Sequence, residues 1–532
     1  MKKLYYGGEI ITMICENDAP EAVVIEDDRI LYVGTIEQAQ NLCDDDTERI
    51  NLEGKTLMPS FIDAHSHFFH AAQRIRMCDL SEVYNFAELQ QALRKYKEDN
   101  DIKEDGIILA SGYDHNFLEE EMHPDKKVLD EVSDTIPIYI SHISGHMGIA
   151  NSALLNLAGI TNDTPDPQGG KYERNADGSL NGYVEETPAL MQLLMVTMPR
   201  IKTDMVNQVL ETQQMYLKNG ITTVQEGAVM GQGFEPLVKL ASAGLFQIDV
   251  VAYILNDQYK ETLMNYPEYN GTYMHRLKIG GAKVILDGSP QGKSAWLSKP
   301  YEGESEYCGY PTHDNDYVKK CCIDAVKEGY QILAHCNGDA ASEQFLSCYE
   351  SAIKSISDSD VDLRPVMIHC QTVSEDQLDR MKKIHMIPSI FVGHTYYWGD
   401  VHLKNLGEDR GNNVSPVKSA LEKGLIYNFH QDTPVTKPDM LHSVWCAVNR
   451  ITRKGKQIGK EQCIGVFDAL KAVTINAAYE YHEEKEKGTL ESGKLADMVI
   501  LQSNPLKEDK IKIKDIVVCE TIKEGKTVYR HP

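Results

Sequence analysis

The 532-residue sequence predicts an α/β fold in which parallel strands alternate with helices, arranged either as a sheet or as a barrel. Apolar, strand-like runs in the middle of the chain are each followed by an amphipathic helical stretch. Residues 329–336 (GYQILAHC) precede such a stretch at 339–356, and residues 364–370 (RPVMIHC) precede another at 374–384. The interval between the two runs is close to the length of about 30 residues that one strand–helix unit requires.

The two ends of the chain have a different pattern, with short strand-like segments separated by turns. These segments are residues 3–13, 22–34 and 49–59 near the N-terminus, and 488–503 and 513–530 near the C-terminus. Because chain termini often lie close together, we expect both ends to form one small β domain. The predicted boundaries are 1–57 and 485–532 for this domain and 58–484 for the barrel, with an irregular insertion at about 71–200.

Composition excludes several classes of protein. Hydrophobic residues at 42% and charged residues at 25% are typical of a folded globular chain. A net charge of −26 opposes attraction to DNA, RNA or anionic lipid, so nucleic acid and membrane partners are not expected. No apolar run approaches the roughly 18 residues of a membrane span, and the 12 cysteines have no disulfide-type spacing. We therefore expect a cytoplasmic protein with reduced thiols, and the sequence leaves a homodimer open.

Three histidines follow a short apolar run in the stretch MPSFIDAHSHFFH, residues 58–70. Side chains at i and i+2 of a strand point to the same side, so His65 and His67 can present both imidazoles to one metal ion. His70 falls on a different phase, and we expect it to be structural or at the edge of the pocket. On this motif alone, hydrogen-bonded loop histidines are an equally good interpretation.

Later apolar runs also end on side chains that can bind a metal ion. His335 ends one run, His369 ends the next, and the segment 425–435 passes from apolar residues to Asp432. In a parallel barrel the carboxyl ends of the strands converge on one mouth, where residues distant in sequence meet. This recurrence favours a metal site to which the first strand contributes its two histidines.

Lys283 lies inside a further apolar run, residues 276–292. Burial of an ammonium group is costly, so one interpretation is that Lys283 pairs with a nearby carboxylate such as Asp287. The other interpretation is a lysine that has reacted with carbon dioxide to form a carbamate, an oxygen ligand able to bridge two metal ions. The sequence leaves both interpretations open.

Taken together, the motifs resemble the amidohydrolase superfamily and, within it, the YtcJ-like group of metal-dependent amidohydrolases. Some members of this group are labelled exoenzyme regulatory protein AepA, and one branch hydrolyses N-substituted formamides. The resemblance covers nearly the whole chain. It rests on PSFIDAHSH (59–67), AKVILDGSPQG (282–292), AHCNGDAA (334–341), MIHCQ (367–371), HQDTPV (430–435) and KGTLESGKLADMVIL (487–501).

The resemblance implies a distorted TIM (β/α)8 barrel, a small β-sandwich domain formed by both termini, and one or two divalent metal ions, usually zinc. Ser60 stands where the family usually has glycine, and His430 and Gln431 stand where the group commonly has glycine and serine. The groups around the ligands are therefore expected to differ from those of the family. Matched position by position, the implied metal ligands are His65, His67, Lys283 (often carboxylated at this position), His335, His369 and Asp432.

The implied reaction is hydrolysis of an amide-like carbon–nitrogen bond, other than a peptide bond, in a small N-acyl, N-formyl or cyclic amide substrate. A metal ion lowers the pKa of its bound water to about 7. Asp432 would then accept the proton and pass it to the leaving amine, while His369 or His146 polarises the carbonyl. Resemblance to the insertion of the group places Asp114, His115 and His146 in the substrate pocket.

Two other functions are compatible with the same residues. One is a non-catalytic regulatory or binding protein that retains the barrel. The other is a deaminase or isomerase that uses the same metal site, because a barrel fold does not determine the reaction.

Overall fold

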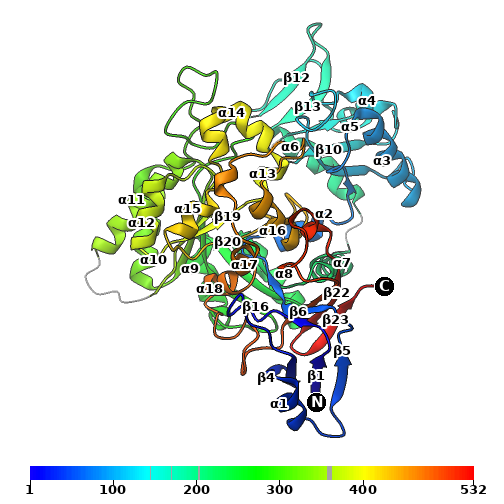
Figure 1. Cartoon of the computed structure of the whole chain (residues 1–532). Helices are drawn as coiled ribbons and strands as arrows, with labels where there is room; N and C mark the ends of the chain where they lie inside the picture. The colour runs from blue at the N-terminus through cyan, green and yellow to red at the C-terminus, as the bar shows by residue number, and fades with distance from the viewer. Residues whose placement is uncertain (144, 146, 169, 202–203, 356–361) are drawn as a thin grey trace. The chain divides into compact units, whose positions relative to one another are not determined.

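The computed structural model describes residues 1–143, 145, 147–168, 170–201, 204–355 and 362–532. These residues form two units. The first consists of Met1–Ala71 together with Val209–Pro532, and the second of Ala72–Gln208. The first unit therefore contains both ends of the chain, which Figure 1 colours blue and red.

Eight parallel strands form the central sheet of the first unit, which confirms the predicted barrel-type α/β fold. Their order is β20-β19-β18-β17-β16-β15-β14-β7. Beyond the two outermost strands, backbone hydrogen bonds run from Asp432 to His65 and from His67 to Thr433, so the sheet closes at its carboxyl edge as a distorted barrel. The strands are β7 (Phe61–Ile62), β14 (Ile221–Val229), β15 (Asp249–Leu255), β16 (Leu277–Ile285), β17 (Gln331–Cys336), β18 (Val366–His369), β19 (Ile387–Ile390) and β20 (Asn428–Phe429).

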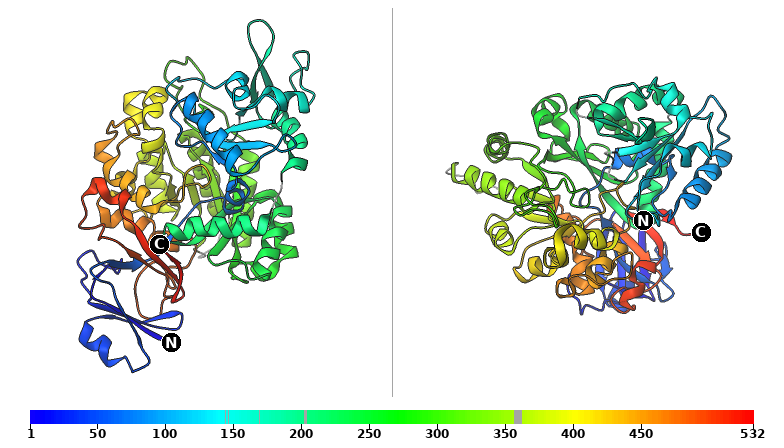
Figure 2. Two further views of the ribbon diagram at one scale, coloured as in Figure 1. Left: turned by 90° about the vertical axis from the view of Figure 1, so that its right-hand side faces the viewer. Right: turned by 90° about the horizontal axis from the view of Figure 1, so that it is seen from above.

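Helices follow these strands and surround the sheet, as the green to orange ribbons of Figure 2 (right) show. Local signals fix their ends. Asp314 caps α10 by accepting a hydrogen bond from the Tyr317 amide, and Ser374 and Gln377 form a reciprocal capping box on α12. The helices are α8 (Gly231–Ser242), α9 (Asn256–Asn265), α10 (Asn315–Glu328), α11 (Asp339–Ser355), α12 (Glu375–Lys383), α13 (His394–Tyr397), α14 (Gly399–Asn412), α15 (Val417–Glu422), α16 (Met440–Asn449), α17 (Val466–Ala472) and α18 (Ile475–Glu480).

Apolar side chains fill the barrel interior, so the barrel is a packed core rather than a channel. Part of this core comes from α18 and the residue after it, which pack against the inward-facing side chains of the strands. The cluster consists of Ile62, Ala64, Val251, Tyr253, Leu333, Val366, Ile368, Ile387, Ala477, Ala478 and Tyr481.

Strands from the two ends of the chain pair directly with one another. β6 (Thr56–Pro59) is antiparallel to β21 (Met498–Leu501), and Figure 1 shows these ends side by side. The five-stranded sheet is completed by β2 (Glu9–Ile10), β22 (Val518–Lys523) and β23 (Lys526–Arg530). A second sheet, of order β4-β3-β1-β5, consists of β1 (Lys2–Tyr6), β3 (Ala22–Glu26), β4 (Arg29–Gly34) and β5 (Glu48–Asn51). Leu57, Met498 and Ile522 from one sheet share a core with Val23 and Ile25 from the other.

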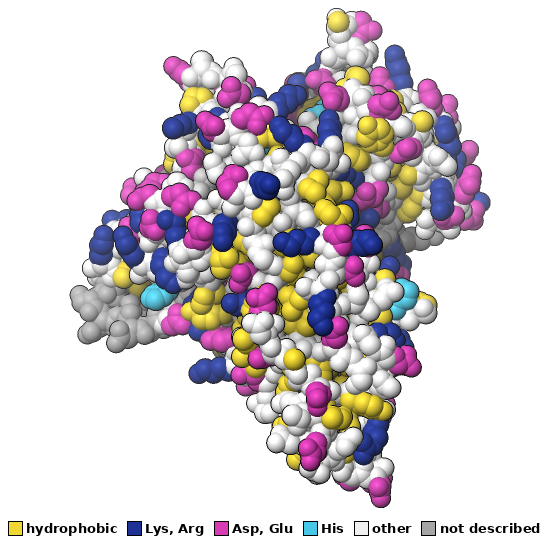
Figure 3. All heavy atoms as spheres, in the orientation of Figure 1, with side chains coloured by type: hydrophobic (Ala, Val, Ile, Leu, Met, Phe, Trp, Pro, Cys, Tyr) yellow, Lys and Arg dark blue, Asp and Glu magenta, His cyan; other side chains and the backbone are white. Residues whose placement is uncertain are grey.

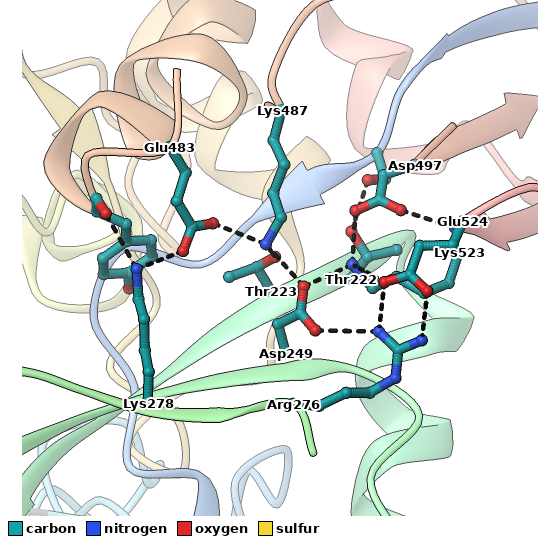
Figure 4. A network of polar contacts seen from close by, with 12 residues as sticks. Thr222, Thr223, Asp249, Arg276, Lys278, Glu483, Lys487, Asp497, Lys523 and Glu524 are labelled. Carbon is teal, nitrogen blue, oxygen red and sulfur yellow. Dashed lines mark hydrogen bonds and ion pairs between the residues drawn. The ribbon is translucent and has the colours of Figure 1, made fainter. Parts of the chain in front are cut away.

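A network of buried ions lies at the amino ends of the barrel strands (Figure 4). Asp249, at the start of β15, accepts hydrogen bonds from Lys487 Nζ at 2.7 Å, Lys523 Nζ at 2.6 Å and Arg276 Nη1 at 3.0 Å. Burial opposes ionisation of Asp249, but these three cations hold its pKa well below the usual value. Because Lys523 ends β22 and also contacts Asp497 at 2.6 Å, the network joins the β domain to the base of the barrel.

The second unit is built on a six-stranded sheet of order β12-β13-β11-β10-β9-β8. Its strands β8, β9 and β10 are parallel, whereas β11, β12 and β13 pair antiparallel. The strands are β8 (Cys78–Asp79), β9 (Ile108–Tyr113), β10 (Ile138–His142), β11 (Met147–Ala150), β12 (Lys171–Arg174) and β13 (Leu180–Glu185), and the main helices are α3 (Phe86–Asp99), α4 (Lys126–Asp130), α5 (Ser152–Leu157) and α6 (Thr187–Thr197).

Two surface features bear on the expected partners. Within the described part of the chain, no helix is both long enough and apolar enough to cross a bilayer. On the face drawn in Figure 3, acidic and basic side chains are interspersed rather than segregated.

Candidate metal centre

The predicted ligands occupy the carboxyl edge of the barrel. His65 and His67 come directly after β7, and Asp432 comes shortly after β20, where the sheet closes. Lys283 lies near the end of β16, beside the same group. The remaining two, His335 and His369, belong to the last residues of β17 and β18.

The geometry of this edge suits a bound cation. His67 Nε2 lies 3.2 Å, and His65 Nε2 3.5 Å, from Asp432 Oδ1, and the three atoms fall within 4.8 Å of one another. Asp432 Oδ1 is buried and accepts no hydrogen bond from the described residues. Leaving a buried carboxylate oxygen unsatisfied is expensive, and two imidazole nitrogens and a carboxylate are ligands that zinc accepts. The residues present therefore fit a divalent metal ion.

Gln225 determines which nitrogen of His65 is available. The amide Nε2 of Gln225 donates to the Ala64 carbonyl at 2.6 Å and to Glu480 Oε1 at 3.2 Å, so its Oε1 faces His65 Nδ1 at 2.5 Å. Nδ1 must then carry the proton, which leaves the lone pair of Nε2 pointing toward Asp432. Burial lowers the pKa of His65 well below its usual value, and the imidazole is held neutral, the form that binds metal ions.

His335 and His369 form the other half of the edge. Their rings are 4.4 Å apart between centroids, and the ring of His369 lies 5.7 Å from that of His65. The Nδ1 atom of each ring has a hydrogen-bond partner. Asp287 Oδ1 lies 3.1 Å from His335 Nδ1, and His430 Nε2 lies 3.2 Å from His369 Nδ1. His430, one of the positions where the sequence departs from the family pattern, therefore helps to orient His369.

Lys283 does not form the structural pair with Asp287 that one interpretation of the sequence suggested. Asp287 instead faces His335 and accepts the backbone amides of Asn337 at 3.0 Å and Gly338 at 2.7 Å. Lys283 Nζ lies 3.4 Å from His65 Nε2, and burial lowers its pKa to about 8 although Asp432 opposes that shift. A sizeable fraction of this amine is therefore neutral near pH 8.

Two of the predicted ligands have a backbone conformation that non-glycine residues rarely adopt. The φ angles are +80° at His369, +50° at the adjacent Cys370 and +54° at Asp432. Each such conformation costs about 1–3 kcal/mol and persists only where the surrounding structure imposes it. The strain falls where β18 and β20 turn into the loops that carry the ligands.

The sequence did not identify several supporting residues. Gln225 and Glu226 are buried polar residues of β14, and Glu480 ends α18. Glu226 accepts a hydrogen bond from the Phe69 amide, and burial raises its pKa to about 6 although His67 acts in the opposite direction. Two adjacent polar residues inside an otherwise apolar strand could have identified Gln225 and Glu226 from the sequence. The contact of Glu480 with Gln225 depends on tertiary structure alone.

The predicted substrate-binding residues belong to the second unit. Asp114 and His115 follow β9 directly, and both lie beside His142. His146 lies outside the described residues. The role of Asp114 and His115 in substrate binding stays a prediction.

The chain is similar to known proteins over nearly its whole length. Residues 48–529 match the protein family described as the amidohydrolase family. LONG AFTER FAR-RED 3 of Arabidopsis thaliana is 29% identical, covering 99% of this chain and 91% of its own, and N-substituted formamide deformylase of Arthrobacter pascens is 25% identical, covering 98% and 97%. YtcJ of Bacillus subtilis is 25% identical over 99% of both chains. The crystal structure of an uncharacterized metal-dependent hydrolase from Pyrococcus horikoshii superposes over 100% of both chains with a TM-score of 0.77 at 24% identity, and it shows the same fold.

Proposed function

Because the chain belongs to the amidohydrolase family, we propose that it is a metal-dependent hydrolase that cleaves a non-peptide carbon–nitrogen bond of a small N-acyl, N-formyl or cyclic amide. The observation that carries the proposal is the convergence of the His65 and His67 imidazoles on Asp432 Oδ1, a buried carboxylate oxygen that accepts no hydrogen bond from the described residues. The similarity to a formamide deformylase over nearly the whole chain supports the choice of bond.

The proposed ligands of a first ion are His65, His67 and Asp432, with Lys283 beside them, and those of a second ion are His335 and His369. Zinc is the metal that this set of nitrogen and oxygen donors suits best. When bound, such an ion polarises a carbonyl group and lowers the pKa of water.

Asp432 is the proposed proton carrier. Burial would raise its pKa, but His67, His430 and Lys283 together lower it, so the carboxylate is ionised at neutral pH. It can accept a proton from the attacking water and deliver it to the nitrogen as the carbon–nitrogen bond breaks, while the water oxygen remains on the acyl carbon. His369, whose Nδ1 is engaged by His430, retains Nε2 for an ion or for the substrate carbonyl.

Lys283 is proposed to react with carbon dioxide. Its neutral amine would form a carbon–nitrogen bond to CO2 and release one proton, which converts a buried cation into an anionic oxygen ligand. The depressed pKa and the position beside His65 support this chemistry.

The test combines metal analysis with a substrate panel. Purified, unchelated protein is analysed for divalent ions and assayed with added zinc or manganese on N-formyl amines, N-acyl amines, hydantoins and lactams. We expect bound metal and release of an amine, and we expect His65→Ala and His67→Ala to abolish both while the fold is kept. Protein without bound metal and without activity on the panel would overturn the proposal, and release of ammonia from an aminopurine would favour a deaminase instead.

A further inference from the structure

The second unit contains its own group of metal-binding side chains at the ends of two parallel strands. Asp114 and His115 follow β9, and His142 is the last residue of β10, the parallel neighbour of β9. The register of this pair shifts between Ser141 and His142, so that His142 lies opposite Tyr113. Carboxyl ends of adjacent parallel strands open onto one edge of a sheet, which is where α/β sheets bind their ligands.

The donor atoms of the three side chains converge. His115 Nδ1 lies 3.2 Å from His142 Nε2, and Asp114 Oδ1 lies 3.6 Å from His142 Nε2 and 3.9 Å from His115 Nδ1. Ligand bonds of 2.0–2.2 Å in a tetrahedral zinc site place neighbouring donor atoms about 3.3–3.6 Å apart. One observed separation matches that range, and the other two lie within about half an ångström of it.

These side chains are withdrawn from solvent to different degrees. Asp114 is 10% exposed and His142 5% exposed, whereas His115 is 28% exposed. Burial opposes ionisation of Asp114, but His142 and the Asn116 amide lower its pKa, so the carboxylate is an anion among imidazoles. Such a site has the two nitrogens and one oxygen of a three-ligand zinc site.

Neighbouring residues hold the donors in place. The backbone and side-chain amides of Asn116 donate to Asp114 Oδ1 at 2.9 and 3.1 Å. The ring of His123 stacks on His115 at 3.9 Å between centroids, and its Nδ1 lies 3.0 Å from the Tyr113 hydroxyl. Burial lowers the pKa of His123 to about 3, so this ring adds no charge. Partners that orient the ligands are typical of metal sites.

We propose that Asp114, His115 and His142 bind a zinc-like transition-metal ion in the second unit, in addition to any ion held by the barrel. The ion would link the ends of β9 and β10 and stabilise the unit that carries them. This gives Asp114 and His115 the role of ligands where sequence resemblance suggested contact with substrate. The proposal does not depend on the reaction proposed for the barrel.

The experiment counts zinc in a protein whose barrel ligands are removed. A variant that carries His65→Ala, His67→Ala, His335→Ala, His369→Ala and Asp432→Asn is exposed to excess zinc, desalted and analysed by mass spectrometry for bound metal. We expect about one equivalent of zinc to remain, and we expect addition of His142→Gln to remove it. His123→Gln is the matched control, because it changes a half-buried histidine of the same cluster that is not a proposed ligand, and it should keep the zinc.

Circular dichroism and thermal unfolding of each variant separate loss of metal from loss of the fold. If the barrel variant retains no zinc, or if zinc persists after His142→Gln in a folded protein, the proposal is wrong. Neither result bears on the barrel, whose zinc is measured in the wild-type background. In that background, a folded His115→Gln, His142→Gln variant should hold about one equivalent less than the wild type.

Discussion

The two ends of the barrel both bury charged groups, but they satisfy them in opposite ways. At the base, Asp249 accepts hydrogen bonds from two lysines and an arginine (Figure 4). At the mouth, Asp432 Oδ1 is also buried, but it accepts no hydrogen bond from the described residues. Native proteins satisfy nearly all buried polar atoms. The three cations around Asp249 therefore fit a structural role, whereas the unsatisfied Oδ1 of Asp432 beside two imidazoles fits the metal site proposed above.

The largest expected effect is that of Asp432→Asn at the mouth. The amide keeps the volume of the side chain but cannot accept a proton, so kcat should fall on the order of 10²–10⁴-fold. Thermal unfolding should be changed little, because no hydrogen bond to Oδ1 is lost. Steady-state kinetics on whichever amide the panel identifies provides the measurement. A variant that keeps full kcat would show that another group carries the proton.

The corresponding change at the base, Asp249→Asn, should act on stability instead. It leaves Lys487 and Lys523 buried with one acceptor fewer, and breaking a buried ion pair costs about 3–5 kcal/mol. Urea unfolding should report this loss, while kcat per folded molecule stays near that of the wild type. The control is Glu235→Gln, which breaks an exposed pair with Lys239 on α8 and should cost less than about 1 kcal/mol. Equal losses in the two variants would contradict the comparison.

The buried ion pairs of Asp249 at the base should also make the free energy of unfolding decrease at acidic pH. The pKa of Asp249 is lowered in the folded state from a usual value of 3.8, so the unfolded chain takes up the proton first as pH falls. Stability from this group is complete well above that value, at about pH 5 and higher, and is lost progressively as pH falls below about 5. Unfolding free energies measured from about pH 5 to 3 should fall more steeply for the wild type than for Asp249→Asn, by up to about 1.4 kcal/mol per pH unit. Parallel pH profiles would mean that Asp249 has no part in the acid response.

The smallest expected effect at the mouth is that of Gln225→Met. Without the amide, His65 loses the partner that keeps Nε2 free, so metal affinity should fall about 10–100-fold while the ligands remain. Competition with a chromogenic chelator measures this change. His70→Ala is the control: His70 is exposed on α2 (Phe68–Arg74), and its removal should leave metal content nearly unchanged. Loss of metal in the control would show that the alternation of side chains along the strand does not separate the ligands His65 and His67 from His70.

Local signals in the sequence predicted an α/β fold of parallel strands and helices, and the resemblance to a known family selected a barrel rather than an open sheet. Strand periodicity and the residue type at each strand end were enough to select His65, His67, His335, His369 and Asp432. The supporting contacts were not accessible in this way, because they join residues that only the folded chain brings together. Gln225 meets Glu480, and His430 meets His369, across sequence separations that no local pattern spans.

The pairing of β6 with β21 has a consequence for synthesis on the ribosome. All eight barrel strands precede residue 430, whereas β6 obtains its partner only after residue 498 has emerged. The metal-binding edge can therefore assemble while β6 still exposes an unpaired strand edge, and such edges favour association with other chains. We expect nascent chains that stop before β21 to aggregate more readily than full-length chains, which sedimentation of truncated translation products would reveal.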